Sequence, residues 1–549
     1  MKYSILLMAC ILTQPVVAQV FQLTNVKGYS LNAKGDLLQF SRLLFENGKI
    51  VALGDEELSS EFPAVIEIDG KGQTLLPGLI DAHGHLLALG ESLLQVDLRG
   101  VQSAKQGALS VREYADQNKQ LSWITGFGWN QVLWPSKTFP TAAQLDEYIN
   151  DRPVWLRRID GHAGWANSQA LKAAGISSET LDPPGGKILR DKAGNPSGVL
   201  IDNAMDLMTP HLPKDSKEQY ARQLSAAAQH LLSVGITSMH DAGIEHSVYE
   251  FYQHMAAEKS LPVRVYAMLS ATDPALESML KTGPIHSQDD FLTIRSVKAY
   301  GDGALGSRGA ALLAPYADAA DHAGLLLTRQ SALAPLFELV LAHNFQLNFH
   351  AIGDKANRLA LDHFAMAFDK VGGRALRNRI EHAQVVSLQD IPRFKQLAII
   401  PSMQATHATS DMNMAEDRLG KERLKGAYAW QKFLQQGSPL AFGSDFPIEL
   451  ANPFHGLHAA VTRQNHQDQP EGGWHSEEAL NMVQAFRAFT LDAAYAAHQE
   501  TVLGSLEVGK WADFILLDQD IFTVDAKDIW RTQVGETWIA GQQRYQKVP

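Results

Sequence analysis

Short apolar runs alternate with longer amphipathic stretches through the middle of the chain. The runs have the length of buried strands, and the stretches between them, such as residues 220–234 and 329–342, have the apolar spacing of helices. Regular alternation of strands and helices predicts a parallel sheet. Eight strand–helix units predict a (β/α)8 TIM-type barrel, in which the active site lies at the C-terminal ends of the strands. The predicted strands are residues 75–85, 236–241, 263–268, 296–302, 345–350, 379–382, 398–403 and 440–445.

The two ends of the chain have a different pattern. Residues 20–74 alternate apolar and polar positions with frequent Gly and Asp, and the same texture returns only at residues 512–517 and 534–539. These are signals of short β-strands. We therefore predict that residues 19–75 and 500–549 form one composite small β-sandwich domain, which brackets a barrel at residues 76–499.

Roughly residues 100–220 form a large insertion after the first barrel strand. So long a connection is expected to be functional or separately folded. Five of the ten tryptophans fall in it, namely Trp123, Trp129, Trp134, Trp155 and Trp165. These rings fit either the core of a separate unit or an apolar lid that excludes water from the barrel mouth.

Residues 1–18 have the features of a signal peptide. Lys2 supplies a positive charge, residues 5–12 are apolar, and small residues at 16–18 offer a cleavage site. The alternatives are a buried N-terminal strand and a lipoprotein signal at Cys10. We expect an exported protein, periplasmic or secreted. Cys10 is the only cysteine, so the mature chain would have no disulfide and no thiolate chemistry.

Composition and charge narrow the kinds of partner. The 549 residues are 45% hydrophobic and 20% charged, which is typical of a globular protein with more than one domain. The net charge is −12 and no long Lys/Arg run occurs, so no electrostatic case exists for nucleic acid or an anionic membrane. No run after the signal peptide is long enough to span a bilayer. We expect a small-molecule substrate, and the sequence leaves a monomer or a homodimer open.

The first predicted strand ends in two histidines, His83 and His85. Residues two apart on a strand face the same side, so both imidazoles can approach one point. Imidazole is the commonest metal ligand in proteins. The ends of other predicted strands add Lys298, His350, His382 and Asp445.

These six side chains would converge on one face of a barrel. Nitrogen and carboxylate ligands suit zinc and other divalent ions. Such an ion lowers the pKa of its bound water, so that hydroxide is available to attack a polarised carbonyl. A carboxylate beside that water can take its proton and pass it to the leaving group. Asp445 is the candidate for this general base, and it is also a candidate ligand.

Several motifs resemble the amidohydrolase superfamily. One resemblance is carried by residues 77–85 together with Lys298, His350, His382 and Asp445. Another is carried by residues 503–513, which resemble the segment where that superfamily's chain returns to its small β domain. Five further segments resemble a branch of this superfamily called amidohydrolase family 3, which includes N-substituted formamide deformylase-like enzymes. These segments are residues 160–163, 182–186, 302–308, 350–354 and 443–447.

This resemblance implies roles for the six residues. His83 and His85 would bind the more buried metal, and Asp445 would be both ligand and general base. His350 and His382 would bind a second metal, or one of them would complete a single-metal site. Lys298 matches the position where many members carry a carboxylated lysine that bridges two metals. The alternative is an ordinary lysine, paired with Asp302 or Asp445, beside one metal. Zinc is expected, one or two ions per chain, with iron and manganese left open.

A second group of residues has weaker signals. His240 and Asp241 end the second strand and are candidates for orienting the ligands. His407 follows the seventh strand and is a candidate for substrate contact. Arg308 either binds a substrate oxygen or anchors its loop. Glu381 is predicted to point away from the site, because it precedes His382 on a strand. Two residues of the insertion, His162 and Trp165, are candidates for lining the pocket.

The sequence thus predicts a metal-dependent amidohydrolase. It would hydrolyse a non-peptide C–N bond, in an amide or N-substituted formamide with an apolar substituent. The alternatives are a metal-dependent isomerase or esterase on the same barrel, or a non-catalytic periplasmic binding protein.

Overall fold

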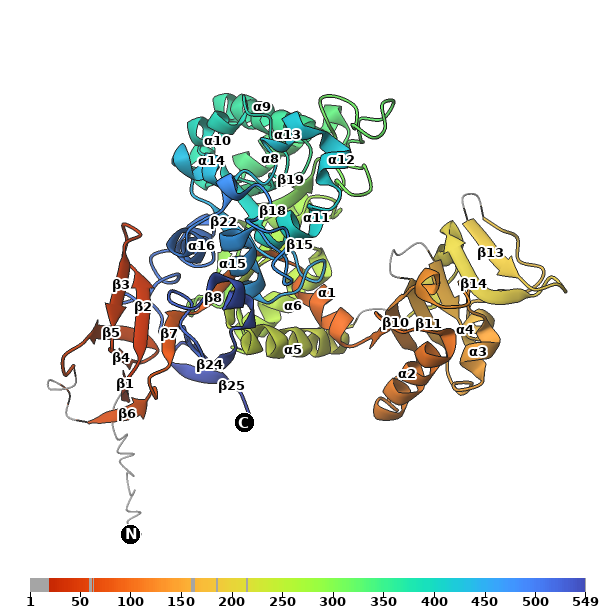
Figure 1. Cartoon of the computed structure of the whole chain (residues 1–549), viewed down its shortest axis with the longest axis horizontal. Coiled ribbons are helices and arrows are strands. Elements are labelled where there is room, and N and C mark those ends of the chain that lie inside the picture. Colours follow the sequence, from red (N-terminus) through yellow and green to blue (C-terminus); the bar gives the residue numbers. More distant parts are fainter. Residues whose placement is uncertain are drawn as a thin grey trace, which may run out of the picture.

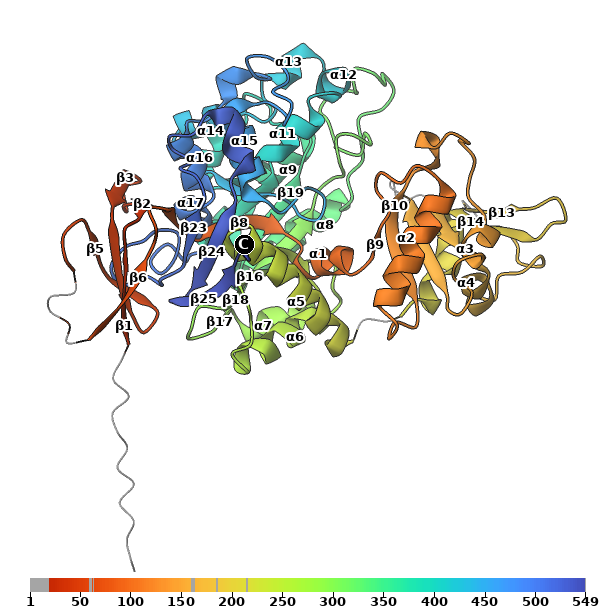
Figure 2. The ribbon, with the colours of Figure 1, turned by 60° about the horizontal axis from the view of Figure 1, so that its bottom comes forward.

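The computed structural model describes residues 19–58, 62, 64–158, 163–183, 186–213 and 216–548. The predicted signal peptide, residues 1–18, lies outside this part and stays a prediction. Figure 1 shows a central barrel, with a sandwich of mainly red and blue strands on one side and the orange and yellow insertion on the other. Figure 2 shows the same arrangement after rotation.

The central sheet contains all eight predicted barrel strands, in parallel pairing from one to the next. Backbone hydrogen bonds join the last strand to the first: Asp445 N donates to His83 O at 2.7 Å, and His85 N to Phe446 O at 2.8 Å. The (β/α)8 fold is therefore confirmed, and its closing seam runs through candidate site residues. The strands are β8 (Leu79–Gly84), β15 (Ile236–Ile244), β16 (Arg264–Ser270), β18 (Leu292–Tyr300), β19 (Gln346–Ala351), β20 (Arg379–His382), β21 (Ile400–Gln404) and β22 (Ala441–Gly443).

Helices surround the barrel strands. In α5, the Ser216 side chain accepts a hydrogen bond from Gln219 N at the start of the helix, a cap worth about 1 kcal/mol. Its buried face follows helical spacing through Leu224, Ala227 and Leu231, which pack in the main core. No described helix is long and apolar enough to cross a membrane. The helices are α1 (Leu86–Leu93), α5 (Lys217–Ser233), α6 (His246–Ala257), α7 (Leu276–Thr282), α8 (Gln330–Ala342), α9 (Asp354–Val371), α10 (Ile391–Leu397), α11 (Ala405–Asp411), α12 (Ala415–Leu419), α13 (Lys421–Leu424), α14 (Trp430–Gln435), α15 (Pro453–Thr462), α16 (Met482–Ala488) and α17 (Leu491–Ala496).

Two further sheets pack face to face as the sandwich. One has the order β5-β4-β1-β6, and the other, β25-β24-β23-β7-β2-β3, combines strands from both ends of the chain. Antiparallel pairing of β7 with β23 places Leu76 opposite Ile515. Phe45, Phe514 and Trp538 contribute to a shared core. The strands are β1 (Val20–Thr24), β2 (Lys27–Leu31), β3 (Leu37–Phe40), β4 (Arg42–Glu46), β5 (Lys49–Gly54), β6 (Val65–Asp69), β7 (Thr74–Pro77), β23 (Phe514–Leu517), β24 (Val534–Ile539) and β25 (Gln542–Gln546).

The insertion has its own sheet and its own hydrophobic clusters. Trp129, Trp134 and Trp165 are almost fully buried there, and the indole nitrogen of each donates to a backbone carbonyl within the insertion. The structure therefore places Trp165 in the core of the insertion and not along a pocket of the barrel. The elements are β9 (Val96–Asp97), α2 (Ala104–Gln117), β10 (Ile124–Trp129), α3 (Ala142–Asp146), β11 (Val154–Arg158), β12 (Ala163–Ala166), α4 (Ser168–Ala173), β13 (Gly186–Arg190) and β14 (Pro196–Asp202).

Candidate metal centre

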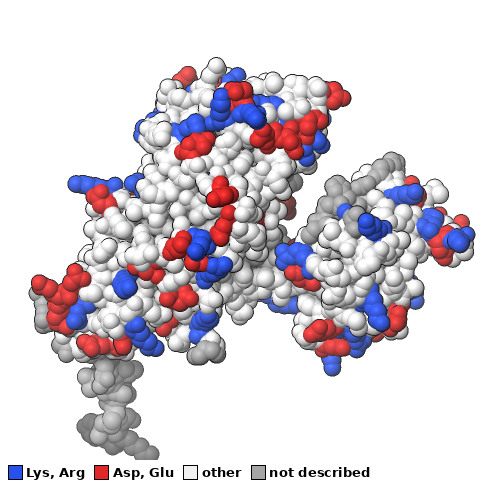
Figure 3. Space-filling view, viewed as in Figure 1, with Lys and Arg blue, Asp and Glu red and all other residues white. Residues whose placement is uncertain are grey.

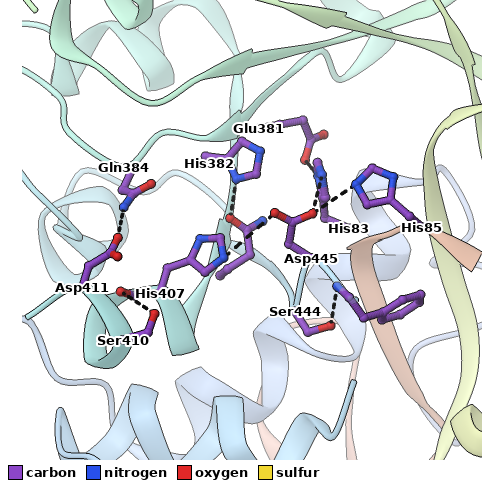
Figure 4. Close-up of polar contacts among 12 residues, drawn as sticks. His83, His85, Glu381, His382, Gln384, His407, Ser410, Asp411, Ser444 and Asp445 are labelled. Carbon is purple, nitrogen blue, oxygen red and sulfur yellow. Dashed lines mark hydrogen bonds and ion pairs between the residues drawn. The ribbon is translucent and has the colours of Figure 1, made fainter. Parts of the chain in front are cut away.

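His83, His85 and Asp445 meet at the barrel's closing seam. The Asp445 Oδ1 atom lies 3.2 Å from His85 Nε2 and 3.6 Å from His83 Nε2. Figure 4 shows both imidazoles directed at this carboxylate. Donor atoms of the three residues lie within 4.8 Å of one another, and no other such trio of His, Cys, Asp or Glu occurs among the described residues.

Strand geometry holds this trio. Asp81 lies two residues before His83 on β8, and its carboxylate accepts hydrogen bonds from His83 N at 3.0 Å and from the Ser444 hydroxyl at 2.7 Å. It thus joins the first barrel strand to the chain after the last one. Asp445 follows with φ 63°, a left-handed conformation that is uncommon outside glycine and is often found at functional sites.

Asp445 is held in its ionised form. Burial alone would raise the pKa of this carboxyl, but the hydrogen bond with His85, together with the interactions with the neighbouring imidazoles, outweighs it. The pKa of Asp445 therefore lies well below its usual range, and the carboxylate is charged at neutral pH.

Glu381 also belongs to the site, contrary to the prediction that it points away. Its Oε2 lies 2.6 Å from His83 Nδ1, and its Oε1 lies 3.1 Å from Arg379 Nε. Burial would raise the pKa of Glu381, but Arg379 and His83 lower it to about 2. A carboxylate on Nδ1 fixes the tautomer of a histidine and leaves Nε2 for a metal.

Strand alternation fails at this position for a local reason. His382 has φ 73° and Ala383 has φ 41°, so the backbone leaves the extended conformation as β20 ends. Consecutive side chains there need not face opposite sides, and Glu381 and His382 both reach the barrel interior.

Lys298 lies beside His83 and is not paired with Asp302. Its Nζ is 3.1 Å from His83 Nε2, and the side chain is buried. The Asp302 carboxylate instead accepts the backbone N–H groups of residues 311, 352 and 353. Burial lowers the pKa of Lys298 to about 8, against the opposing effect of Glu381.

His350 and His382 form the other half of the site. Their ring centroids are 4.4 Å apart, and that of His382 is 4.8 Å from that of His83. The Nδ1 atom of His382 lies 2.8 Å from Gln404 Oε1, which leaves its Nε2 for another partner. The Nε2 atom of His350 is buried without a hydrogen-bond partner. A buried polar atom of this kind fits a metal ligand.

Three weaker candidates contact the residues around the candidate metal ligands. Arg379 Nη1 lies 2.9 Å from His240 Nδ1, so His240 is linked to His83 through Arg379 and Glu381. Asp241 accepts hydrogen bonds from Leu86 N and from a tyrosine hydroxyl, and so holds the start of α1 directly after His85. His407, on α11, points at Asp445, with its Nε2 4.0 Å from Oδ2 (Figure 4).

Arg308 pairs with Asp318 at 2.9 Å, and Arg418 pairs with the same carboxylate. This geometry matches the loop-anchoring alternative. His162 lies outside the described residues, so its predicted pocket role stays a prediction.

Comparison with known proteins decides the family. A model described as "Amidohydrolase family" matches residues 67–545. The chain belongs to the amidohydrolase family. Its relatives include the protein LONG AFTER FAR-RED 3 of Arabidopsis thaliana, 34% identical over 97% of this chain and 93% of that protein. The putative amidohydrolase YtcJ of Bacillus subtilis is 32% identical, over 94% of this chain and 98% of that protein. The N-substituted formamide deformylase of Arthrobacter pascens is 25% identical, over 92% of this chain and 95% of that protein.

A solved structure resembles this amidohydrolase closely. An uncharacterized metal-dependent hydrolase from Pyrococcus horikoshii OT3 superimposes with a TM-score of 0.78 at 27% identity, covering 92% of this chain and 99% of that one. Family and structure together make this protein a hydrolase with a candidate metal site of His83, His85 and Asp445.

The electrostatics of this amidohydrolase predict that metal stays bound well below pH 6.5. Burial lowers the pKa of His83 to about 4 and that of His350 to about 3. Only a neutral imidazole binds metal, so affinity falls as the pH drops through these values. After stepped dialysis, elemental analysis should find the metal retained at about pH 5.5 and lost near pH 4. Half-loss at the ordinary histidine pKa of 6.5 would contradict this picture.

Proposed function

We propose that this amidohydrolase is metal-dependent and hydrolyses a non-peptide C–N bond, in an amide or N-substituted formamide with an apolar substituent. The observation that carries the proposal is the convergence of His83, His85 and Asp445 at the barrel mouth, with donor atoms within 4.8 Å. The name of the Arthrobacter relative, N-substituted formamide deformylase, supports the choice of bond.

The metal-binding roles follow from the donor atoms. His83, His85 and Asp445 would hold one divalent ion, with zinc the best match to two imidazoles and a carboxylate. Lys298, His350 and His382 would complete a second position beside it. Such ions supply an activated water and polarise the carbonyl that is attacked.

The chain's own residues would handle the proton. Asp445, ionised and 3.2 Å from His85, would take the proton of the attacking water at a carboxylate oxygen and deliver it to the departing amine nitrogen. His407, whose Nε2 lies 4.0 Å from Asp445 Oδ2, would help to position the substrate. Glu381 would keep His83 oriented throughout.

Exposed apolar side chains in loops that follow two of the barrel strands support an apolar substituent. Leu325 and Leu327, in the loop after β18, are 66% and 63% exposed, and Ile448, three residues after Asp445, is 73% exposed. Exposed apolar groups next to a site favour apolar ligands. On the face seen in Figure 3 the two signs of charge are interspersed without a continuous basic patch, which gives no support for a nucleic-acid substrate.

We further propose that Lys298 is carboxylated in the loaded enzyme. Its Nζ is buried beside His83, and no ion pair within 4.0 Å is found for it in the described part of the chain. A pKa of about 8 leaves part of the amine neutral, the form that adds to carbon dioxide and loses a proton to give a carbamate.

Carbon-13 bicarbonate should therefore give a protein carbamate resonance in the metal-loaded enzyme. The resonance should vanish in Lys298→Met and persist in Lys510→Met, which removes another buried lysine, one that is paired with Glu507. A spectrum that is identical for wild type and Lys298→Met would eliminate the carbamate and favour an ordinary lysine beside one metal.

The function itself is tested with metal-stripped protein and a panel of N-acyl, N-formyl and cyclic amides. Amine release should be absent without metal and restored by zinc. If the reloaded protein releases no amine from any amide but cleaves matched esters, the C–N assignment is wrong.

A further inference from the structure

A second cluster of histidines lies beside α11 and includes none of the six barrel candidates. It lines a pocket of about 230 Å³. His455 and His458 come from α15, and His466 from the loop that follows. The remaining polar lining is Thr406, Thr409, Ser410, Glu449, Gln464, Asn465 and Gln467.

The three imidazoles lie close together. His455 and His458 are three residues apart on α15, so they share one face of the helix. The ring centroid of His466 is 4.5 Å from that of His455 and 5.7 Å from that of His458. On a tetrahedral ion with nitrogen ligands at about 2.0–2.1 Å, imidazole centroids lie roughly 5 Å apart, so this spacing suits shared ligation.

One donor in the cluster lacks a partner in the folded chain. His458 is 1% exposed, and its Nε2 is buried with no hydrogen bond. A buried polar atom left unpaired points to an unseen water or ion. Burial lowers the pKa of His455 and of His458 to about 4, and lowers that of His466, so all three are neutral at pH 7 with a lone pair available.

Trp530 fixes the position of His466. The indole stacks on the His466 ring at 4.2 Å and an interplanar angle of 10°, and it also contacts His455 edge-on. Trp530 belongs to the short 3-10 helix η6 (Ala526–Arg531), which packs on α15 from the C-terminal part of the chain. The loop after α15 and the helix η6 therefore hold the His466 imidazole over the face of α15.

We propose that His455, His458 and His466 form a second transition-metal site, for an ion of the Zn²⁺, Ni²⁺ or Cu²⁺ class. Such ions favour imidazole ligands, and the described residues include no cysteine thiolate, which would favour softer ions. The donor nitrogens do not converge within 4.8 Å as those of the barrel trio do. Shared ligation would therefore require the half-buried rings of His455 and His466 to turn, and a flip of His466 about its Cβ–Cγ bond keeps that ring parallel to Trp530. Glu449 also lines the pocket and would offer a carboxylate.

The pocket lining includes none of the six barrel candidates. Helix α11 contributes to both places: His407 Nε2 lies 4.0 Å from Asp445 Oδ2, and Thr406, Thr409 and Ser410 line the pocket. An ion in the pocket would link α15 to the loop after it without touching the barrel ligands.

The test counts zinc by elemental analysis after loading and dialysis. Wild type and His254→Gln, which changes an exposed histidine of α6, should bind the same number of equivalents. His466→Gln should bind one fewer. Equal numbers in all three proteins would overturn the proposal. Circular dichroism checks that each variant is folded.

A second measurement needs no variant. Anomalous scattering at the zinc edge from crystals of loaded wild type should show a peak among the three rings as well as at the barrel mouth. A peak at the barrel mouth alone would overturn the second site and leave the proposed hydrolase intact. Failure of the barrel site to bind would remove only the barrel peak.

Discussion

Changing Asp445 to asparagine is expected to lower kcat/KM by about a thousandfold, the effect of removing a general acid–base group. The amide has nearly the same shape but cannot accept the proton of the attacking water. Asp445 is suited to that task because its Oδ1 contacts His83 and His85 while its Oδ2 faces His407. Steady-state kinetics on an amide that the wild type cleaves would measure the loss.

Two controls separate chemistry from metal loss and from simple charge removal. Metal content is measured on the same samples, because Asp445 is also a candidate ligand. Asp321→Asn removes the same charge from an exposed position in the loop after β18 and should leave kcat/KM within about twofold. An Asp445→Asn enzyme that keeps its metal and at least a tenth of wild-type kcat/KM would rule out Asp445 as the base.

Changing Glu381 to glutamine is expected to weaken metal binding by about 10–100-fold, the usual effect of losing a carboxylate behind a ligand histidine. The change weakens the 2.6 Å contact with His83 Nδ1. It also leaves the buried guanidinium of Arg379 without its carboxylate partner, and breaking such a pair costs about 3–5 kcal/mol of unfolding free energy. Competition with a chelator measures affinity, and urea unfolding of the metal-free protein measures stability.

Glu500→Gln is the matched control. Glu500 pairs with Arg377 at 2.7 Å, just before β20, but that pair is partly exposed and remote from the metal ligands. Its loss should cost about 1 kcal/mol or less and leave metal affinity unchanged. If Glu381→Gln and Glu500→Gln bind zinc equally well, then Glu381 does not orient His83.

The barrel and most of its candidate site could be predicted from the sequence because the signals are local. Apolar runs predict the strands, and strand ends on one barrel face converge whatever their spacing in the chain. This is why His83, Lys298, His350, His382 and Asp445, far apart in sequence, are neighbours in the structure.

What the sequence could not show depends on backbone detail and packing. Strand alternation predicts that Glu381 faces away from the site, and this prediction is wrong because the backbone leaves the extended conformation at His382, whose φ is 73°. Asp81 lies two residues before His83 and therefore on the same face of the strand, and this spacing is the sequence signal that places it at the site. The sequence pattern of the insertion's tryptophans fits both a core and a lid, and the fold shows that Trp129, Trp134 and Trp165 are internal.

Hydrolysis in oxygen-18 water by the zinc-loaded protein, with an N-formyl amine that carries an apolar substituent, tests the proposed reaction itself. We expect free amine together with formate that contains one solvent oxygen, and no turnover by the metal-free protein. Turnover that yields a rearranged product without solvent oxygen would contradict this expectation and indicate a metal-dependent isomerase on the same barrel.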